Sequence, residues 1–404
     1  MPIVPKRRAA LLGLLGAALL WPALLAGAAQ AQPAPRLSVE GEPQLVYRYA
    51  ADRCDPQSIP DSPARAYRRP DGSIALIAAH FQNRMMFGRD FDSLRLDCRH
   101  VSRGAESDDP SRFDDRYWIQ AFYPLPDGRV LGLASNEFAG RRHRACQAGQ
   151  GRPECWYMAI TALVAQPGDM QFSLLPRQNR VVAAAPSRFT TETGRTGFST
   201  VSNIVTADDA GRHDGRGRWI HFIGWTEDSS GPGGRGNCLF RAERANPLGG
   251  WSVLSGGRYL PMADAYEGDG RSPPPGCDKI GQRGLRGKVR SVVWLEQQRL
   301  WLAVYATRNV DLPGQKGATG VFYATSPDLQ NWSEPALLAP FEPFWGRTAC
   351  GEFYEYPSVI DHASRDTTFE TVGQAPYLYL TRANWQDCRR GMNRDLVRYR
   401  LRLQ

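Results

Sequence analysis

The segment from residue 64 to residue 80, ARAYRRPDGSIALIAAH, has two short apolar stretches on either side of an Asp-Gly turn sequence. The segment from 116 to 135, RYWIQAFYPLPDGRVLGLAS, has the same order of features. Asp-Gly is preferred in tight turns between antiparallel strands, and aromatic and β-branched residues favour strands. Both segments are therefore predicted to be β-hairpins. Their nearly continuous apolar runs indicate strands that are buried on both faces.

The same hairpin pattern occurs three more times, at 199–205 with 218–226, at 289–308, and at 356–361 with 375–382. Weaker strand-like stretches follow most of these hairpins. Four-stranded units repeated around an axis are typical of β-propellers. We therefore predict an all-β fold, a five-bladed β-propeller with four-stranded antiparallel blades, and an N-terminal strand at 44–50 that joins the last blade and closes the ring. A two-sheet sandwich is the alternative.

The composition also indicates a turn-rich globular protein. The chain has 404 residues, of which 42% are hydrophobic, with 40 Gly and 30 Pro. This content excludes a largely disordered chain and argues against a helical bundle. The net charge is +9, but only four of the 50 basic residues are Lys, and the arginines are scattered among 41 acidic residues. Nucleic acid is therefore not an expected partner.

The N-terminus has the features of a secretory signal peptide. A basic segment at 6–8 precedes a long apolar stretch that ends in Ala-Gln-Ala at 29–31. This order is typical of cleaved signals, and a membrane anchor is the alternative. We expect a signal peptide at 1–31, a linker at 32–43 and a single domain at 44–404. The mature protein is expected to be a monomer in the periplasm or outside the cell, without a membrane span.

Eight cysteines suit an oxidising compartment. They allow 105 pairings, and our default expectation is that sequence neighbours pair. The expected pairs are Cys54 with Cys98, Cys146 with Cys155, Cys238 with Cys277, and Cys350 with Cys388. No Cys-x-x-Cys pair is present, and the His residues are not grouped at ligand spacing, so neither a metal site nor a cofactor is expected.

The segment 319–338, TGVFYATSPDLQNWSEPALL, resembles the strand–Ser-x-Asp-Leu-x-x-Trp–strand signature of five-bladed propellers in glycoside hydrolase families 43, 32 and 130. Residues 59–80 are similar to the first-blade motif of family 43, but Asp61 is followed by Ser62 where that motif has Asp-Pro. Residues 168–176 resemble a degraded sialidase Asp-box, and 136–140 resembles a segment of secreted sialidase-like propeller proteins. The resemblance implies a propeller that acts on glycans.

In a propeller, the residues just before the first strand and just after the second strand of each blade lie at the same mouth of the central channel. Carboxylates, arginines and tryptophans at one mouth suit a site for an oligosaccharide or polysaccharide, because Trp stacks on sugar faces and carboxylates transfer protons. These positions are Asp61 and His80; Asp114, Asp115, Asn136, Glu137 and His143; Asn203, Trp225 and Glu227; Arg290 and Arg308; and Glu352, Glu355, Arg382 and Trp385.

Three of these carboxyl groups are candidate catalytic residues. Asp61 is the predicted general base or nucleophile, at the position that the family 43 resemblance implies. Glu137 is the predicted acid, because it follows an apolar strand directly in a loop bounded by glycine. Glu355 resembles the Glu-x-Pro acid motif of family 32, in a different blade. The alternatives are a turn-capping role for Asp61 and a loop ion pair for Glu137.

A glycoside hydrolase is the favoured function, and two alternatives remain. Asn203 stands where family 43 is expected to have a third carboxylate, which supports a non-catalytic carbohydrate- or protein-binding propeller. A lyase acting on uronate polymers would use His143, Tyr356 and Arg382 instead of two acids. The guanidinium groups of Arg290, Arg308 and Arg382 could together hold a substrate carboxylate, as in sialidases, or could brace contacts between blades.

Overall fold

Asp-Gly turns join neighbouring antiparallel strands in the computed structural model. Asp71 Oδ1 accepts hydrogen bonds from the backbone N and the hydroxyl of Ser73, at 3.0 and 2.6 Å, and Gly72 has a φ of +82°. The side-chain bonds and the positive φ explain why Asp-Gly is used here. The structure describes residues 35–146, 154–228, 234–262, 265–267, 276–345, 350–385, 388 and 391–404.

Strands account for nearly all of the regular structure. The strands are β1 (Leu37–Tyr47), β2 (Pro60–Arg68), β3 (Ile74–Ala79), β4 (Arg84–Gly88), β5 (Arg95–His100), β6 (Arg116–Pro124), β7 (Val130–Ala139), β8 (Trp156–Ala165), β9 (Phe172–Leu174), β10 (Val181–Ala183), β11 (Arg195–Val201), β12 (Val205–Ala207), β13 (Trp219–Thr226), β14 (Gly236–Glu243), β15 (Ser252–Ser255), β16 (Arg258–Pro261), β17 (Ser291–Leu295), β18 (Leu300–Leu312), β19 (Gln315–Ser326), β20 (Ala336–Ala339), β21 (Gly351–Asp361), β22 (Thr371–Val372), β23 (Pro376–Trp385) and β24 (Arg394–Leu403). The short helices are α1 (Tyr49–Asp52), η1 (Pro110–Arg112) and α2 (Arg177–Arg180).

The strands form four hydrogen-bonded sheets. Two are four-stranded, with the orders β2-β3-β4-β5 and β1-β24-β23-β21, and one is five-stranded, with the order β20-β19-β18-β17-β22. The fourth has eleven strands, because residues 195–197 of β11 pair in parallel with residues 156–158 of β8. Two of the expected four-stranded units are therefore joined through this parallel pair. The expectation of separate, purely antiparallel sheets of four strands is wrong at this point.

The first strand pairs with the last. β1 is antiparallel to β24, with Leu37 opposite Leu403, so it forms the outer strand of the sheet that ends the chain. A strand in this region was expected from the sequence, but it begins at Leu37 rather than at residue 44, and α1 begins at Tyr49. Residues 37–43 are therefore strand and not linker.

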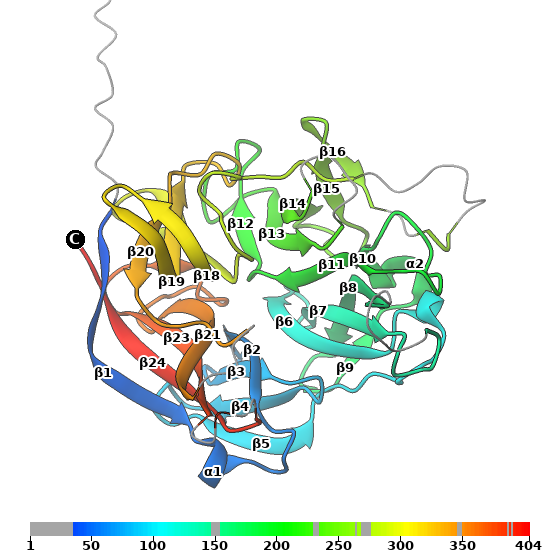
Figure 1. The fold of residues 1–404 in the computed structure, drawn as a ribbon, viewed down its shortest axis with the longest axis horizontal. Helices are drawn as coiled ribbons and strands as arrows, with labels where there is room; N and C mark the ends of the chain where they lie inside the picture. The colour runs from blue at the N-terminus through cyan, green and yellow to red at the C-terminus, as the bar shows by residue number, and fades with distance from the viewer. Residues whose placement is uncertain are drawn as a thin grey trace, which may run out of the picture. The chain divides into compact units, whose positions relative to one another are not determined.

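A buried arginine ties the innermost strands together. In Figure 1, β2, β6, β11 and β21 lie innermost within residues 35–404, and β2 packs against both β6 and β21. Arg65 of β2 donates to Ser358 Oγ at 2.8 Å and to the carbonyls of Val201, at 3.4 Å, and Arg290. Burial and the nearby Arg290 charge lower the pKa of Arg65 to about 9. One side chain thus connects three segments that are distant in sequence.

Apolar residues fill the spaces between neighbouring sheets. Ile77 of β3, Ile119 of β6 and Phe172 of β9 belong to one buried cluster, which joins the β2-β3-β4-β5 sheet to the eleven-stranded sheet. Residues 35–404 form one unit by their contacts. Within the described ranges, no helix is long and apolar enough to cross a membrane.

Disulfides link each of the four expected cysteine pairs. The bonds are Cys54–Cys98, Cys146–Cys155, Cys238–Cys277 and Cys350–Cys388. Disulfides of this number are typical of proteins that fold in oxidising compartments.

Candidate functional site

Asp61 is surrounded by hydrogen-bond donors from four different strands or turns. Tyr356 of β21 donates its hydroxyl to Asp61 Oδ1 at 3.1 Å, and Trp118 of β6 donates Nε1–H to Oδ2 at 3.3 Å. Arg394 of β24 forms an ion pair with Oδ1, and His80 Nε2 lies 3.7 Å from Oδ2. These partners fit an acceptor carboxylate that is oriented on both of its oxygens.

His80 is neutral in this setting. Burial lowers its pKa to about 4, although the Asp61 carboxylate acts in the opposite direction. Its ring packs edge-on against those of Phe81 and Trp118, with centroids 4.4 and 5.7 Å apart. The expected neighbourhood of Asp61 and His80 is therefore present, and aromatic rings extend it on one side.

Two strained residues flank Arg290, which precedes β17. Thr200 in β11 has a φ of 61° and Tyr356 in β21 has a φ of 58°, and both strands shift register there. Arg290 donates to Thr200 Oγ1 at 3.2 Å and lies over the Tyr356 ring at 4.8 Å. A positive φ is unfavourable for β-branched and bulky residues, and bulges of this kind redirect side chains near functional sites. The strain therefore marks the surroundings of Arg290 as a candidate site.

Glu137, near the end of β7, is a partly buried carboxyl group beside other charges. Burial raises its pKa to about 7, while the positive charges of Lys288 and Arg195 act in the opposite direction. The carboxylates of Asp61 and Glu227 raise it further. The charges of these four side chains therefore all act on the Glu137 carboxyl group. Glu137 therefore holds a proton up to nearly neutral pH in the neighbourhood of Asp61.

Glu355 of β21 has a similar pKa for a similar reason. It is 5% exposed, and burial raises its pKa to about 7 against the opposing charges of Arg290 and Arg308. Its Oε1 lies 3.6 Å from Arg290 Nη2, and its Oε2 is buried with no hydrogen-bond partner among the residues described. Glu355 is thus a second carboxyl group that is disposed to stay protonated.

Glu227, which follows β13, is a third carboxyl group with the opposite behaviour. Its Oε1 contacts Lys288 Nζ and lies 3.2 Å from both Arg195 Nη2 and Ser199 Oγ, and Oε2 lies 3.8 Å from Arg235 Nε. Burial alone would raise the pKa of Glu227, but the cations outweigh it and lower the pKa below its usual value. Glu227 is therefore ionised.

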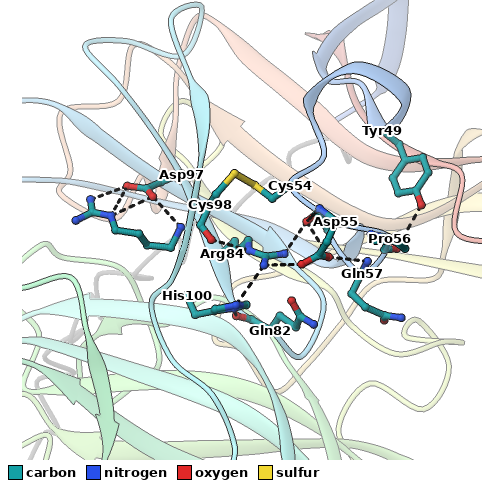
Figure 2. A network of polar contacts seen from close by, with 12 residues as sticks. Tyr49, Cys54, Asp55, Pro56, Gln57, Gln82, Arg84, Asp97, Cys98 and His100 are labelled. Atoms are coloured by element: carbon teal, nitrogen blue, oxygen red, sulfur yellow. Dashed lines mark hydrogen bonds and ion pairs between the residues drawn. A yellow bond between two sulfur atoms is a disulfide. The ribbon is translucent and has the colours of Figure 1, made fainter.

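The segment that precedes Asp61 is held by the network in Figure 2. Arg84 of β4 donates to Asp55 Oδ2 and Ser58 Oγ, both at 2.6 Å, and to the carbonyl of Cys98 at 2.9 Å. The Cys54–Cys98 disulfide joins the same segment to β5. The start of β2 is thereby fixed by both a covalent bond and charge-assisted hydrogen bonds.

Arg308 and Arg382 each bind partners of their own, although the charge of Arg308 acts on Glu355 together with that of Arg290. Arg308 Nε binds Glu342 at 2.8 Å, and its other nitrogens reach backbone carbonyls. Arg382 Nη2 binds Asp395 at 2.9 Å. Each guanidinium group thus has a protein partner of its own, which fits the alternative in which these arginines brace strands and loops. The three-arginine clamp stays a prediction.

His143 and Asn203 also have local structural partners. His143 Nε2 lies 2.8 Å from Asp115 Oδ2, and its ring stacks on Phe138 with centroids 5.0 Å apart. The Asn203 side chain exchanges hydrogen bonds with the backbone of Val292, at 2.6 and 2.7 Å. Asn203 therefore joins two inner segments through its amide group.

Several residues of the site were not among the candidates from the sequence. Trp118, Arg394, Lys288 and Arg195 have no local motif that would single them out. Lys288 lies three residues before β17. Only the residue directly before this strand was selected from the sequence, and a wider window would have included Lys288. In the part of the chain that is described, no group of three or more metal-ligating side chains is suitably placed to hold an ion.

Comparison with known proteins gives similarity in fold. No family model matches the sequence, and no curated protein matches it. A protein of unknown function from Dyadobacter fermentans has a TM-score of 0.50 and 10% identity, over 91% of this chain and 99% of that one. An α-L-arabinanase from Cellvibrio cellulosa has a TM-score of 0.44 and 12% identity, over 86% and 90%. An α-L-arabinofuranosidase from Lactobacillus brevis has a TM-score of 0.47 and 11% identity, over 87% and 93%. At these identities the chemistry has to be argued from the site itself.

Proposed function

We propose that this chain is a glycoside hydrolase in which Asp61 is the general base or nucleophile and Glu137 is the general acid. One observation carries the proposal: Glu137 has a pKa of about 7 and is electrostatically coupled to Asp61, which is held by donors alone. Glycoside hydrolysis needs one carboxyl group that is protonated and another that is ionised. The raised pKa of Glu137 suits the role of the acid, and the donors around Asp61 suit an acceptor carboxylate.

In the proposed reaction, Glu137 gives its proton to the glycosidic oxygen as the bond to the anomeric carbon breaks. Asp61 either takes a proton from the attacking water or bonds to the anomeric carbon itself, and in the second case water later releases the sugar. Tyr356, Trp118 and Arg394 keep the Asp61 oxygens oriented throughout. Glu355 is assigned a supporting role, because it is almost fully buried beside Arg290.

The two alternative functions have less support. A lyase would need His143, Tyr356 and Arg382 to act together, but they bind Asp115, Asp61 and Asp395 respectively. Burial also raises the pKa of Tyr356 well above 10, which disfavours it as a base.

The binding-only interpretation rested on Asn203 in place of a carboxylate. Glu227, which follows β13, supplies a further ionised carboxyl group, and its charge acts on the pKa of Glu137. The site therefore has enough carboxyl groups for acid–base chemistry, which favours a catalytic role over binding alone.

The proposal includes a five-bladed propeller and export from the cytoplasm. The pairing of β1 with β24 supports a ring closed by the N-terminal strand, and the inner segments joined by Arg65 support a common centre. The four disulfides support an exported protein. The expected signal peptide at 1–31 lies outside the described residues. We propose that the mature protein acts as a monomer on an oligosaccharide or polysaccharide.

The test is a reducing-sugar screen of the chain from residue 32 onward against a panel of plant, algal and animal polysaccharides. On any substrate that is cleaved, Asp61→Asn and Glu137→Gln should each lower turnover at least about 100-fold, the lower range for acid–base groups. Glu40→Gln, at a 41% exposed side chain in β1, is the matched control and should leave turnover unchanged. Retained turnover in either site variant would exclude the proposed roles.

A further inference from the structure

Three cations share one buried carboxylate in the site. Lys288, Arg195 and Arg235 each form an ion pair with Glu227. This group therefore carries two more positive than negative charges.

The arrangement turns the positive charges toward solvent. The Glu227 side chain is 3% exposed, whereas those of Arg195, Lys288 and Arg235 are 29, 26 and 49% exposed. The carboxylate thus lies beneath its partners, where it orients them but does not cancel their charge at the surface. Arg195 also has a buried Nε–H with no hydrogen-bond partner in the described ranges. We call Arg195, Lys288 and Arg235 the cationic patch.

Aromatic rings accompany the cationic patch. The Arg195 guanidinium lies over the Trp156 ring at 4.7 Å, and Lys288 Nζ lies over the Trp225 ring at 5.8 Å. Both indole side chains are partly exposed. Indole rings pack against the apolar faces of sugars, and ammonium and guanidinium groups bind carboxylates and sulfates. The patch therefore has the groups needed for a sugar ring that carries a negative charge.

We propose that the cationic patch is a subsite for an acidic sugar residue, so that the substrate is a glycan carrying carboxylate or sulfate groups. The proposal rests on the proposed function for the neighbouring acid and base, because Lys288 and Arg195 are also electrostatically coupled to Glu137. A sugar held on the patch would therefore lie next to the proposed acid. The patch is distinct from the expected three-arginine clamp, of which it contains no member.

Binding to the Asp61→Asn variant of the full mature chain tests the proposal without cleavage of the ligand. The ligands for calorimetry are a chondroitin sulfate tetrasaccharide, its desulfated form, its carboxyl-reduced form, and the neutral form that lacks both charges. We expect the acidic forms to bind at least about tenfold more tightly than the neutral form, with affinity that falls as salt rises. The desulfated and carboxyl-reduced forms show which anion is bound. A galacturonate tetramer and its carboxyl-reduced form extend the test to another backbone.

Variants then locate the binding. Lys288→Met and Arg235→Gln should each weaken binding of the acidic forms at least about tenfold and leave any binding of the neutral form unchanged. The control is Lys316→Met, at a side chain that is 86% exposed in β19. Equal binding of acidic and neutral ligands, no binding of any acidic ligand, or full binding by both patch variants would overturn the proposal. Acidic ligands that bind but are never cleaved by the unaltered protein would support it and refute hydrolysis.

Discussion

Glu137→Gln should make the protein less active and, above neutral pH, more stable. The reason lies in the ionisation of the carboxyl group. Its pKa is raised from 4.5 to about 7 in the folded protein, so the fold resists the loss of this proton. Replacement of a carboxyl group that serves only to stabilise the fold would instead lower the free energy of unfolding.

The size of the effect follows from linkage between protonation and folding. Below about pH 4.5 both the folded and unfolded states hold the proton, and the group does not affect stability. From there to about pH 7 only the unfolded state releases it, so the free energy of unfolding falls by about 1.4 kcal/mol per pH unit. The loss reaches at most about 3 kcal/mol, because the partly buried side chain keeps some contact with water. Glutamine cannot ionise and avoids this loss.

The assay is urea unfolding of the unaltered protein, Glu137→Gln and the control Glu40→Gln at about pH 4 and about pH 8. Glu137→Gln should gain stability relative to the unaltered protein between these pH values, and the control should not. Glu355→Gln should behave like Glu137→Gln, because its pKa is raised in the same direction. If Glu137→Gln shows the same stability difference from the unaltered protein at both pH values, the reasoning about its proton is refuted.

Three further predictions concern stability. Replacing Cys54 and Cys98 by Ser should lower the free energy of unfolding in urea by about 4 kcal/mol, because this disulfide closes a loop with a sequence separation of 44. Removing the disulfide with a sequence separation of 9 should lower it by less. The reverse order would contradict the loop-entropy argument. Arg394→Met should lower the free energy of unfolding in urea at neutral pH by about 3 kcal/mol, because it removes the cation that pairs with the largely buried Asp61 carboxylate. Arg394→Lys should restore part of that loss. Equal stability of both variants and the unaltered protein would refute this prediction. Deleting residues 37–47 should sharply lower the Tm in calorimetry by exposing the edge of β24, and an unchanged Tm would show that β1 is dispensable.

The hairpins could be predicted because their signals are local. In the turn at Gly72, the neighbouring Asp71 side chain satisfies backbone groups, and both strands consist of residues that prefer extended structure. The starts and ends of such strands recur at the same level of each unit, which predicts Asp61 and Glu137 at one site. The effect of the Asp61 charge on the pKa of Glu137 agrees with this prediction. The parallel pairing of β11 with β8 has no such signal and was not foreseen.

The residues alone were enough to predict the all-β fold and a strand near the N-terminus that pairs with the last strand, although not its bounds. The partners of the candidate carboxyl groups follow only from the packing of the sheets. Asp61 receives its donors from residues as far away in sequence as Arg394, and the bulge at Tyr356 aims that side chain at it. The proton on Glu137 likewise depends on burial and on charges from residues that are distant in sequence. Pairing and burial of this kind arise only when the sheets pack together, because no local preference specifies which side chain from a distant strand fills a given position.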